Sequence, residues 1–322
     1  MDEVKKEFRH IPVLLAECLE QSKLSTQHTF VDCTLGGAGH STEVAQLLGP
    51  DGFLIGIDQD EMALAAAGAR LGTIPQNEAP RIELLRRNFG NLDELLMEAQ
   101  VPGVDTFLFD LGVSSPQLDF ESRGFSFKKD APLDMRMDPG RQTTTAAELI
   151  NTLDASELTR IIRDYSDEKW ASRIAQFIVA ERERGPIETS GQLVEIIKAA
   201  IPASARRAGG HPAKRTFQAL RIEVNSELSV LRSGLEAAIR WLNPKGRLVV
   251  ISYHSLEDRV VKEVFAKHAQ TCTCPPGLPV CACGANPSLK VITRKPILPT
   301  EEEIERNARA RSAKLRVAEK LR

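Results

Sequence analysis

The sequence predicts an α/β fold in which a mostly parallel, Rossmann-like sheet is interrupted by an inserted helical segment. In the first half, short apolar strands alternate with helical segments of about ten residues, which is the pattern of βαβ units. From about residue 140 the periodicity is helical and no strand is evident. A clearly apolar strand then resumes at 246–253, so the helical stretch divides the sheet domain.

The elements of the first half follow from their periodicity and from the residues that end them. Short runs rich in apolar residues are expected to form strands at 28–34, 52–58, 81–89 and 104–112. Segments with helical spacing separate them, and one of these ends at a glycine, Gly49, as helices commonly do. These helices are expected at 12–22, 40–49, 61–72 and 91–100.

In the second half, helical periodicity dominates until an Asn-Pro-Lys-Gly turn at 243–246. Helical segments are expected at 144–153, 156–185, 190–201 and 215–242, the last as one long helix or two. We therefore predict a discontinuous sheet domain and an inserted helical domain, at 1–139 with 211–322 and at 140–210 respectively.

Composition is that of a globular protein, with 42% hydrophobic and 27% charged residues in a chain of 322. No apolar run approaches the roughly 20 residues that span a bilayer, and the charged N-terminus lacks the apolar region of a secretory signal. A cytoplasmic protein without membrane contact is expected. The oligomeric state stays open, with a homodimer as one alternative.

Two basic clusters stand out against a formal net charge of −2. Residues 306–322 contain seven Lys or Arg and one acid, and a second cluster combines Arg206, Arg207, Lys214 and Arg215. Such patches are suited to a polyanion, although each could also be the solvated face of a helix.

A glycine loop after the first strand predicts a nucleotide site. Gly36 and Gly37 precede a helix, where a ligand can approach the backbone, and Asp58 ends the next strand, where it could take ribose hydroxyls. A tight turn without a ligand is the alternative. Asp32 starts the loop before its glycines, and the G-x-G-x-x-G of dinucleotide sites is missing, which favours S-adenosylmethionine over NAD.

Long and unusual motifs occur along nearly the whole chain, namely GGAGHS, GIDQD, DLGVSSPQLD, PLDMRMD, HPAKRTFQALRIEVNSEL and ISYHSLEDR. In these motifs the chain resembles the MraW family of bacterial 16S rRNA cytosine-N4 methyltransferases. It implies a class I S-adenosylmethionine-dependent methyltransferase domain with an inserted helical domain for substrate recognition. It also implies methyl transfer to a cytidine in the decoding region of the small ribosomal subunit.

The resemblance and the loop together assign a donor site. Ala38, Gly39 and His40 would line the methionine part, Asp58 would hold the ribose, and Phe89 would lie against the adenine, although a lone aromatic is more often part of a core. The full set of expected donor residues is Asp32, Gly37, Ala38, Gly39, His40, Asp58, Phe89, Asp110 and Gln117.

The acceptor side is expected in the loop after the fourth strand. Amino-methylating enzymes place a short polar, proline-containing loop there to grip an exocyclic amine, and Ser114, Ser115 and Pro116 occupy that place. Asp134 and His254 are candidates for a general base, with helix or loop capping as the alternative for each. Ser255 is expected to cap the helix that follows.

The substrate cytidine must be extruded or single-stranded, because pairing hides its amine. Basic and aromatic side chains grip such RNA. The residues expected to contact it are Arg123, Arg136, Lys214, Arg215, Arg309 and Arg311.

Four cysteines, Cys272, Cys274, Cys281 and Cys283, have the composition of a zinc site, although their spacing is tight and a proline-stiffened loop of reduced thiols is the alternative. Two other functions stay open. One is a NAD-linked oxidoreductase, and the other is an RNA-binding ribosome-assembly factor with a vestigial donor site.

Overall fold

The computed structural model describes residues 12–112, 123–127, 129–206, 211–270, 274 and 286–322. The chain forms two compact units. The sheet unit combines Met1–Gly112 with Val230–Arg322, and the helical unit is Val113–Ser229. Each has a hydrophobic core of its own.

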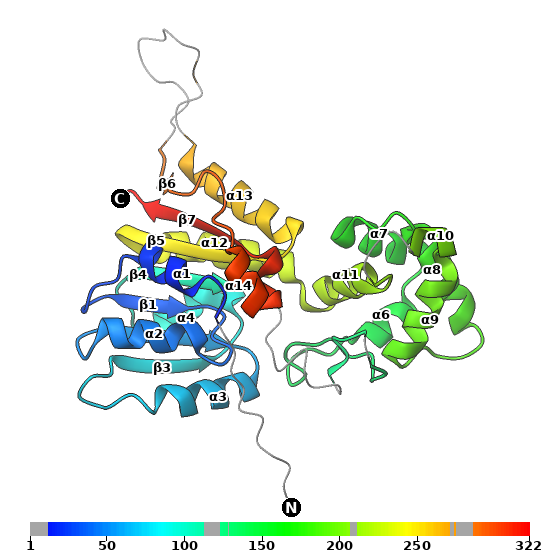
Figure 1. Ribbon diagram of the computed structural model, residues 1–322, viewed down its shortest axis with the longest axis horizontal. Coiled ribbons are helices and arrows are strands. Elements are labelled where there is room, and N and C mark those ends of the chain that lie inside the picture. Colours follow the sequence, from blue (N-terminus) through cyan, green and yellow to red (C-terminus); the bar gives the residue numbers. More distant parts are fainter. Residues whose placement is uncertain (1–11, 113–122, 128, 207–210, 271–273, 275–285) are drawn as a thin grey trace, which may run out of the picture. The chain divides into compact units, whose positions relative to one another are not determined.

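Within the described residues, the sheet unit contains a seven-stranded sheet in the order β3-β2-β1-β4-β5-β7-β6 (Figure 1). Strands β1 to β5 run parallel, and β7 runs antiparallel to both of its neighbours. The strands are β1 Thr29–Asp32, β2 Phe53–Asp58, β3 Arg81–Arg86, β4 Val104–Asp110, β5 Leu242–Ser252, β6 Leu289–Val291 and β7 Lys314–Lys320. The predicted α/β fold, with a mostly parallel sheet and a helical insertion, is confirmed.

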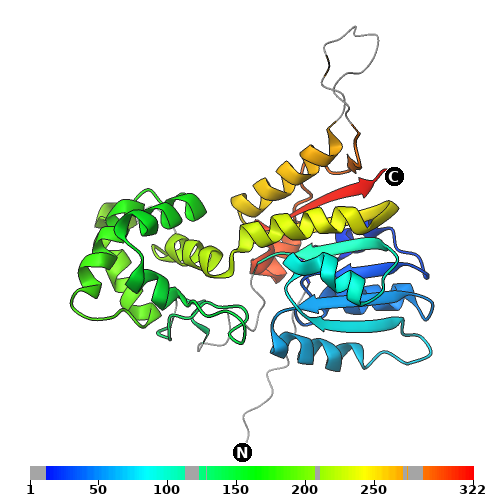
Figure 2. The same cartoon turned by 180° about the vertical axis from the view of Figure 1, so that it is seen from behind.

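Helices cover both faces of this sheet, which is why its central strands are apolar runs (Figures 1 and 2). One face carries α1 Leu15–Ser22, α2 Gly39–Leu48 and α3 Glu61–Leu71. The opposite face carries α4 Leu92–Glu98, preceded by the short helix η1 Phe89–Asn91, and α12 Glu227–Trp241. Helix α13, Ser255–Ala269, lies beside α12, to which the Arg232–Glu263 ion pair joins it.

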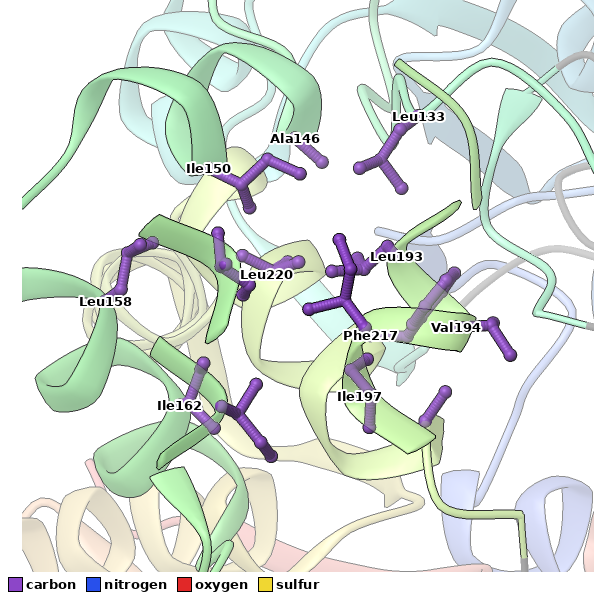
Figure 3. Close-up of a cluster of buried hydrophobic side chains, with 14 of the residues drawn as sticks. Leu133, Ala146, Ile150, Leu158, Ile162, Leu193, Val194, Ile197, Phe217 and Leu220 are labelled. Carbon is purple, nitrogen blue, oxygen red and sulfur yellow. The ribbon is translucent and has the colours of Figure 1, made fainter. Parts of the chain in front are cut away.

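The helical unit is a bundle whose helices begin at well-defined caps. Thr145 and Thr189 each form a capping box, and Asp154 caps a third helix. Large apolar side chains such as Ile162 and Phe217 fill its centre (Figure 3). The helices are α6 Ala146–Thr152, α7 Ala155–Ser166, α8 Ala171–Arg182, α9 Ser190–Ala200, α10 Ala203–Arg206 and α11 Lys214–Asn225.

Left-handed residues divide the two longest predicted helical segments. Asp167, with φ 52°, ends α7, so 156–185 forms two helices. Ser226, with φ 50°, separates α11 from α12, so the alternative of two helices within 215–242 is correct.

The helical unit extends beyond the expected segment 140–210 at both ends. Leu133 and Met135 pack into its core from the N-terminal side, and Phe217 and Leu220 pack into it from α11. Because these residues are buried against the helices, the unit runs from 113 to 229. The sequence pattern marked where helical periodicity begins, not which flanking loops pack with the helices.

The charge pattern of the C-terminal region was compatible with the solvated face of a helix, but much of this region forms a strand. After α14 Glu301–Arg306 and the short helix η3 Ala308–Ser312, the chain enters β7 between β5 and β6. Arg316 on this strand is 8% exposed and donates to Asp258 (Nε to Oδ1, 2.5 Å). The basic tail is therefore partly internal. Among the described residues, no helix combines the length and apolar character needed to cross a membrane.

Candidate functional site

Three acidic residues end neighbouring strands at one edge of the sheet. Asp32 ends β1, Asp58 ends β2 and Asp110 ends β4. Strand β1 lies between the other two, and all three strands run parallel. Their carboxylates therefore gather at the carboxyl edge, where α/β sheets bind ligands.

The glycine loop leaves open space at the start of α2. Gly36 donates its N–H to Asp58 Oδ2 (2.9 Å), which ties the loop to the end of β2. Gly36 and Ala38 have left-handed backbones, with φ of 50° and 56°. A Cβ atom on Gly37 would have no neighbour within 4 Å, and α2 begins two residues later at Gly39 without a side-chain cap from Ala38. The first N–H groups of a helix have no partner within the helix and point toward this end.

Asp32 holds the loop in place. It is 2% exposed, accepts a hydrogen bond from the Ser41 hydroxyl (Oγ to Oδ2, 2.6 Å) and accepts another from the Thr34 N–H (3.1 Å). Burial raises its pKa above the usual range, although these hydrogen bonds oppose the shift. The internal contacts give Asp32 a structural role in shaping the loop, and its direct contact with a ligand stays a prediction.

Asp58 is partly exposed and accepts backbone hydrogen bonds on both carboxylate oxygens. Besides Gly36, the N–H of Asp60 donates to Oδ1 (2.8 Å). Burial raises the pKa of Asp58 to about 6. Each oxygen keeps a second lone pair for a further donor such as a ribose hydroxyl.

Asp110 lies between two side chains from other elements. The Tyr253 hydroxyl donates to its Oδ1 (2.7 Å), and His40 Nδ1 is 3.8 Å from Oδ2. The Asp110 side chain is 17% exposed. Burial raises its pKa, while His40 and the Tyr253 hydrogen bond oppose the shift.

His40 connects the acids to the N-terminal segment. Its Nε2 lies 2.9 Å from the carbonyl oxygen of Val13, and because a carbonyl only accepts, Nε2 carries the hydrogen. The next residue, Leu14, donates its N–H to Glu303 on α14 (2.7 Å). Segments from the two ends of the chain thus meet beside the site, a contact that no local sequence pattern indicates.

Phe89 is half-buried and packs between two elements of the sheet unit. Its ring meets Phe109 of β4 edge to face, with 5.4 Å between centroids. On the other side, a Cβ atom on Gly234 of α12 would lie 2.7 Å from Phe89 Cδ2. These contacts support the core alternative for the ring, and its contact with adenine stays a prediction.

The expected acceptor loop lies outside the described residues. This applies to Ser114, Ser115 and Pro116, and also to the donor candidate Gln117. Their roles stay predictions.

Asp134 is paired with Arg136 in the helical unit. The guanidinium donates to both carboxylate oxygens (Nε to Oδ1 and Nη2 to Oδ2, each 2.8 Å). Burial alone would raise the pKa of Asp134, but the hydrogen bonds from Arg136 outweigh it and the pKa is lowered. This pairing makes Asp134 a weak base and supports the loop-stabilising alternative.

His254 caps helix α13. Its Nδ1 accepts from the Glu257 N–H, and Glu257 accepts from the His254 N–H, which together form a capping box. The expected cap, Ser255, is instead the first residue of the helix, so that prediction is wrong by one position. Histidine is an unusual cap, and residue preferences alone favoured the serine.

The expected RNA-binding residues fall into two groups. The Arg123 guanidinium donates to the carbonyl oxygens of residues Arg136 and Met137 (3.1 and 3.0 Å). The Arg136 guanidinium is bonded to Asp134, so the side chains of Arg123 and Arg136 both make contacts within the helical unit. The other four, Lys214, Arg215, Arg309 and Arg311, are exposed. The Nη1 atom of Arg215 lies 3.9 Å from Oε2 of Glu168.

Of the four candidate zinc ligands, the structure describes Cys274 alone. Cys272, Cys281 and Cys283 lie outside the described residues. The zinc site therefore stays a prediction.

The chain matches known proteins along its length. Residues 7–321 match the profile of the MraW methylase family. Ribosomal RNA small subunit methyltransferase H of Symbiobacterium thermophilum is 55% identical over 98% of this chain and 97% of its own, and the protein of that name from Heliobacterium modesticaldum is 53% identical over 98% and 99%. Among solved structures, a SAM-dependent O-methyltransferase from Thermotoga maritima has a TM-score of 0.43 and 8% identity, covering 100% of this chain and 71% of that one. With a profile match from residue 7 to residue 321 and relatives that are more than half identical from end to end, this chain belongs to the MraW methylase family.

Proposed function

We propose that this protein transfers a methyl group from S-adenosylmethionine to the N4 amine of a cytidine in the decoding region of 16S rRNA. The observation that carries the proposal is the gathering of three acids beside an open glycine loop, in a chain whose relatives are named small-subunit rRNA methyltransferases. The small ribosomal subunit is then the partner, and the cytoplasm is the place of action.

The residues at the sheet edge fit the donor. The space beside Gly37, at the N-terminus of α2, suits the methionine part, with Ala38 and His40 as its lining. Asp58 would accept the ribose hydroxyls. Buried carboxylates with raised pKa values favour a ligand that carries positive charges on sulfur and nitrogen. When bound, the donor supplies an electrophilic methyl group.

The acceptor amine needs orientation more than deprotonation. Its lone pair is delocalised into the cytosine ring. Ser114, Ser115 and Pro116 would accept hydrogen bonds from the amine N–H groups and align the nitrogen with the methyl group. Positioning of this kind can supply much of a rate enhancement. Because the amine becomes acidic only after attack, its proton can pass to water and no dedicated base is required. This agrees with the pairing of Asp134 to Arg136 and with the capping role of His254.

Methyl transfer to isolated small-subunit particles tests the whole proposal. With labelled S-adenosylmethionine, we expect one methyl group per particle, and mass analysis of the nucleosides should identify N4-methylcytidine. A particle with uridine at the modified position should accept no label. Donor binding and RNA binding without any transfer would contradict the proposal and favour the assembly factor with a vestigial donor site.

Exposed basic residues at the start of α11 would hold RNA phosphates. Replacing Lys214 and Arg215 with Gln should weaken RNA binding and reduce the slope of log K against log salt by about 1 to 2, since each phosphate contact contributes about 0.7 to 0.9. The matched control is Arg184→Gln, at an exposed arginine of the same unit. An unchanged salt dependence in the double variant would count against this RNA contact.

A further inference from the structure

Tyr253 directly follows β5 and contacts an acid at the end of β4. Its hydroxyl donates to Asp110 Oδ1 at 2.7 Å, which is a short hydrogen bond to a largely buried carboxylate. Strand β5 pairs with β4, with Asp110 opposite Ile251, so Tyr253 reaches the same sheet edge as the acids.

The position of Tyr253 is fixed on two sides. Its backbone N–H donates to Glu257 Oε2 (2.7 Å), the same carboxylate that completes the cap of α13. Its ring lies over Gly112, where a Cβ atom would be 3.3 Å from Tyr253 Cδ2. Gly112 has φ 110°, which L side chains rarely adopt. Glycine at position 112 therefore allows both the backbone turn after β4 and the close approach of the Tyr253 ring.

The Tyr253 hydroxyl acts as a donor at ordinary pH. Burial, followed by the charge of Asp110, raises the pKa of Tyr253 well above its usual range. A protonated phenol can donate to Asp110 but cannot serve as a base. On the other carboxylate oxygen, His40 stands 3.8 Å away, so groups from β5 and α2 flank Asp110 on both sides.

We infer that Tyr253 is a positioning residue of the donor site, which holds the Asp110 carboxylate in one orientation toward S-adenosylmethionine. This inference rests on the proposed function for the identity of the ligand. A carboxylate fixed before binding needs no reorientation when a cationic ligand arrives, so its attraction for that ligand is fully realised. Because the Tyr253 N–H is bonded to Glu257 at the start of α13, the position of this helix also influences the affinity for the donor.

The test compares Tyr253→Phe, which removes only the hydroxyl, with Tyr165→Phe. The chain has two tyrosines, and Tyr165 lies on α7 of the helical unit, so it is a matched control. Titration calorimetry of the full chain with S-adenosylmethionine and S-adenosylhomocysteine should give about tenfold weaker donor binding for Tyr253→Phe, the size expected for one hydrogen bond to a charged group. Tyr165→Phe should bind as the parent does.

A pH profile separates positioning from simple packing. The hydrogen bond from Tyr253 lowers the pKa of Asp110, so its removal raises that pKa. As the pH is lowered, Asp110 in Tyr253→Phe should therefore take up a proton, and lose affinity for the donor, at a higher pH than in the parent protein. The other titratable groups around Asp110 are His40, Glu257, Asp32 and Cys18, and they are the same in both variants. In an Asp110→Asn background, Tyr253→Phe should have little further effect.

The outcomes distinguish the inference from the function beneath it. No donor binding by the parent protein contradicts the proposed function. Parent binding with an unchanged affinity and pH profile in Tyr253→Phe overturns the inference, as does a tenfold loss that persists in the Asp110→Asn background. If Tyr253→Phe does not fold, Tyr165→Phe leaves Tyr253 as the one tyrosine of the chain. Replacing Asp110 with Asn in that chain must then shift the absorption of Tyr253 and weaken donor binding, and an unchanged band or an unchanged affinity overturns the inference.

Discussion

Asp32, Asp58 and Asp110 all lie where ionisation of the carboxyl group is disfavoured, which no local sequence pattern predicts. Burial raises the pKa of all three, so the ligand-free protein is penalised for each charge at this edge. A ligand with positive charges relieves that penalty, and binding should therefore be linked to proton release.

The pH dependence of donor binding follows from Asp58. Its pKa of about 6 means that ligand-free protein holds a proton there below that pH, whereas hydroxyl groups donate best to the ionised form. Affinity for S-adenosylhomocysteine should therefore fall as pH drops through about 6, with proton release on binding near that pH. Calorimetry in buffers of different ionisation enthalpy measures the release. Asp58→Asn should bind more weakly and release fewer protons, and equal release in both proteins would refute the assignment.

The structure shows stabilising contacts for Asp134 and His254, and a catalytic role for either residue stays a prediction. Sequence alone left both roles open for Asp134 and His254, because a carboxylate or imidazole in a polar loop serves either. In the structure, the Arg136 guanidinium donates to both carboxylate oxygens of Asp134, and His254 exchanges capping hydrogen bonds with Glu257. These hydrogen bonds make His254 the cap in place of Ser255.

At the scale of elements, β7 divides the basic tail into internal and exposed parts. Arg316→Ala should lower the free energy of unfolding by about 3 kcal/mol, because it leaves the buried Asp258 without its main partner. Arg311→Ala, at an exposed position of η3, should leave the unfolding midpoint unchanged. Urea unfolding measures both, and equal stability of the two variants would contradict this division.

The contact between α12 and η1 depends on the absence of a side chain at Gly234. Gly234→Ala should destabilise by about 1 to 3 kcal/mol, because its Cβ would overlap the Phe89 ring. A second substitution, Phe89→Leu, should recover part of that loss. The control is Gly68→Ala in α3, where a Cβ would meet Leu84 at an ordinary 3.6 Å and should stabilise the helix by up to about 1 kcal/mol. Stabilisation by Gly234→Ala would contradict the close contact.

At the scale of the whole molecule, two cores imply two cooperative units. Val113–Ser229 encloses its own apolar centre, so calorimetric heating of the full chain should give two unfolding transitions. S-adenosylhomocysteine should raise the midpoint of the sheet unit only, since a ligand stabilises the unit that binds it. A single transition that shifts as a whole would show that the two cores unfold together.

The alternation of strands and helices, the interruption of the sheet and the three acids at strand ends could all be predicted from the sequence. These features are local, because the apolar period and the residues that end a strand are visible within a short window of sequence. The remaining features arise from contacts between residues far apart in the chain. Tertiary structure placed Tyr253 on Asp110, Gly234 against Phe89 and Arg316 beside Asp258, pairs separated by 143, 145 and 58 residues. It also drew the flanking loops into the helical unit. Such contacts depend on which surfaces meet when the helices pack onto the sheet, and no short stretch of sequence contains that information.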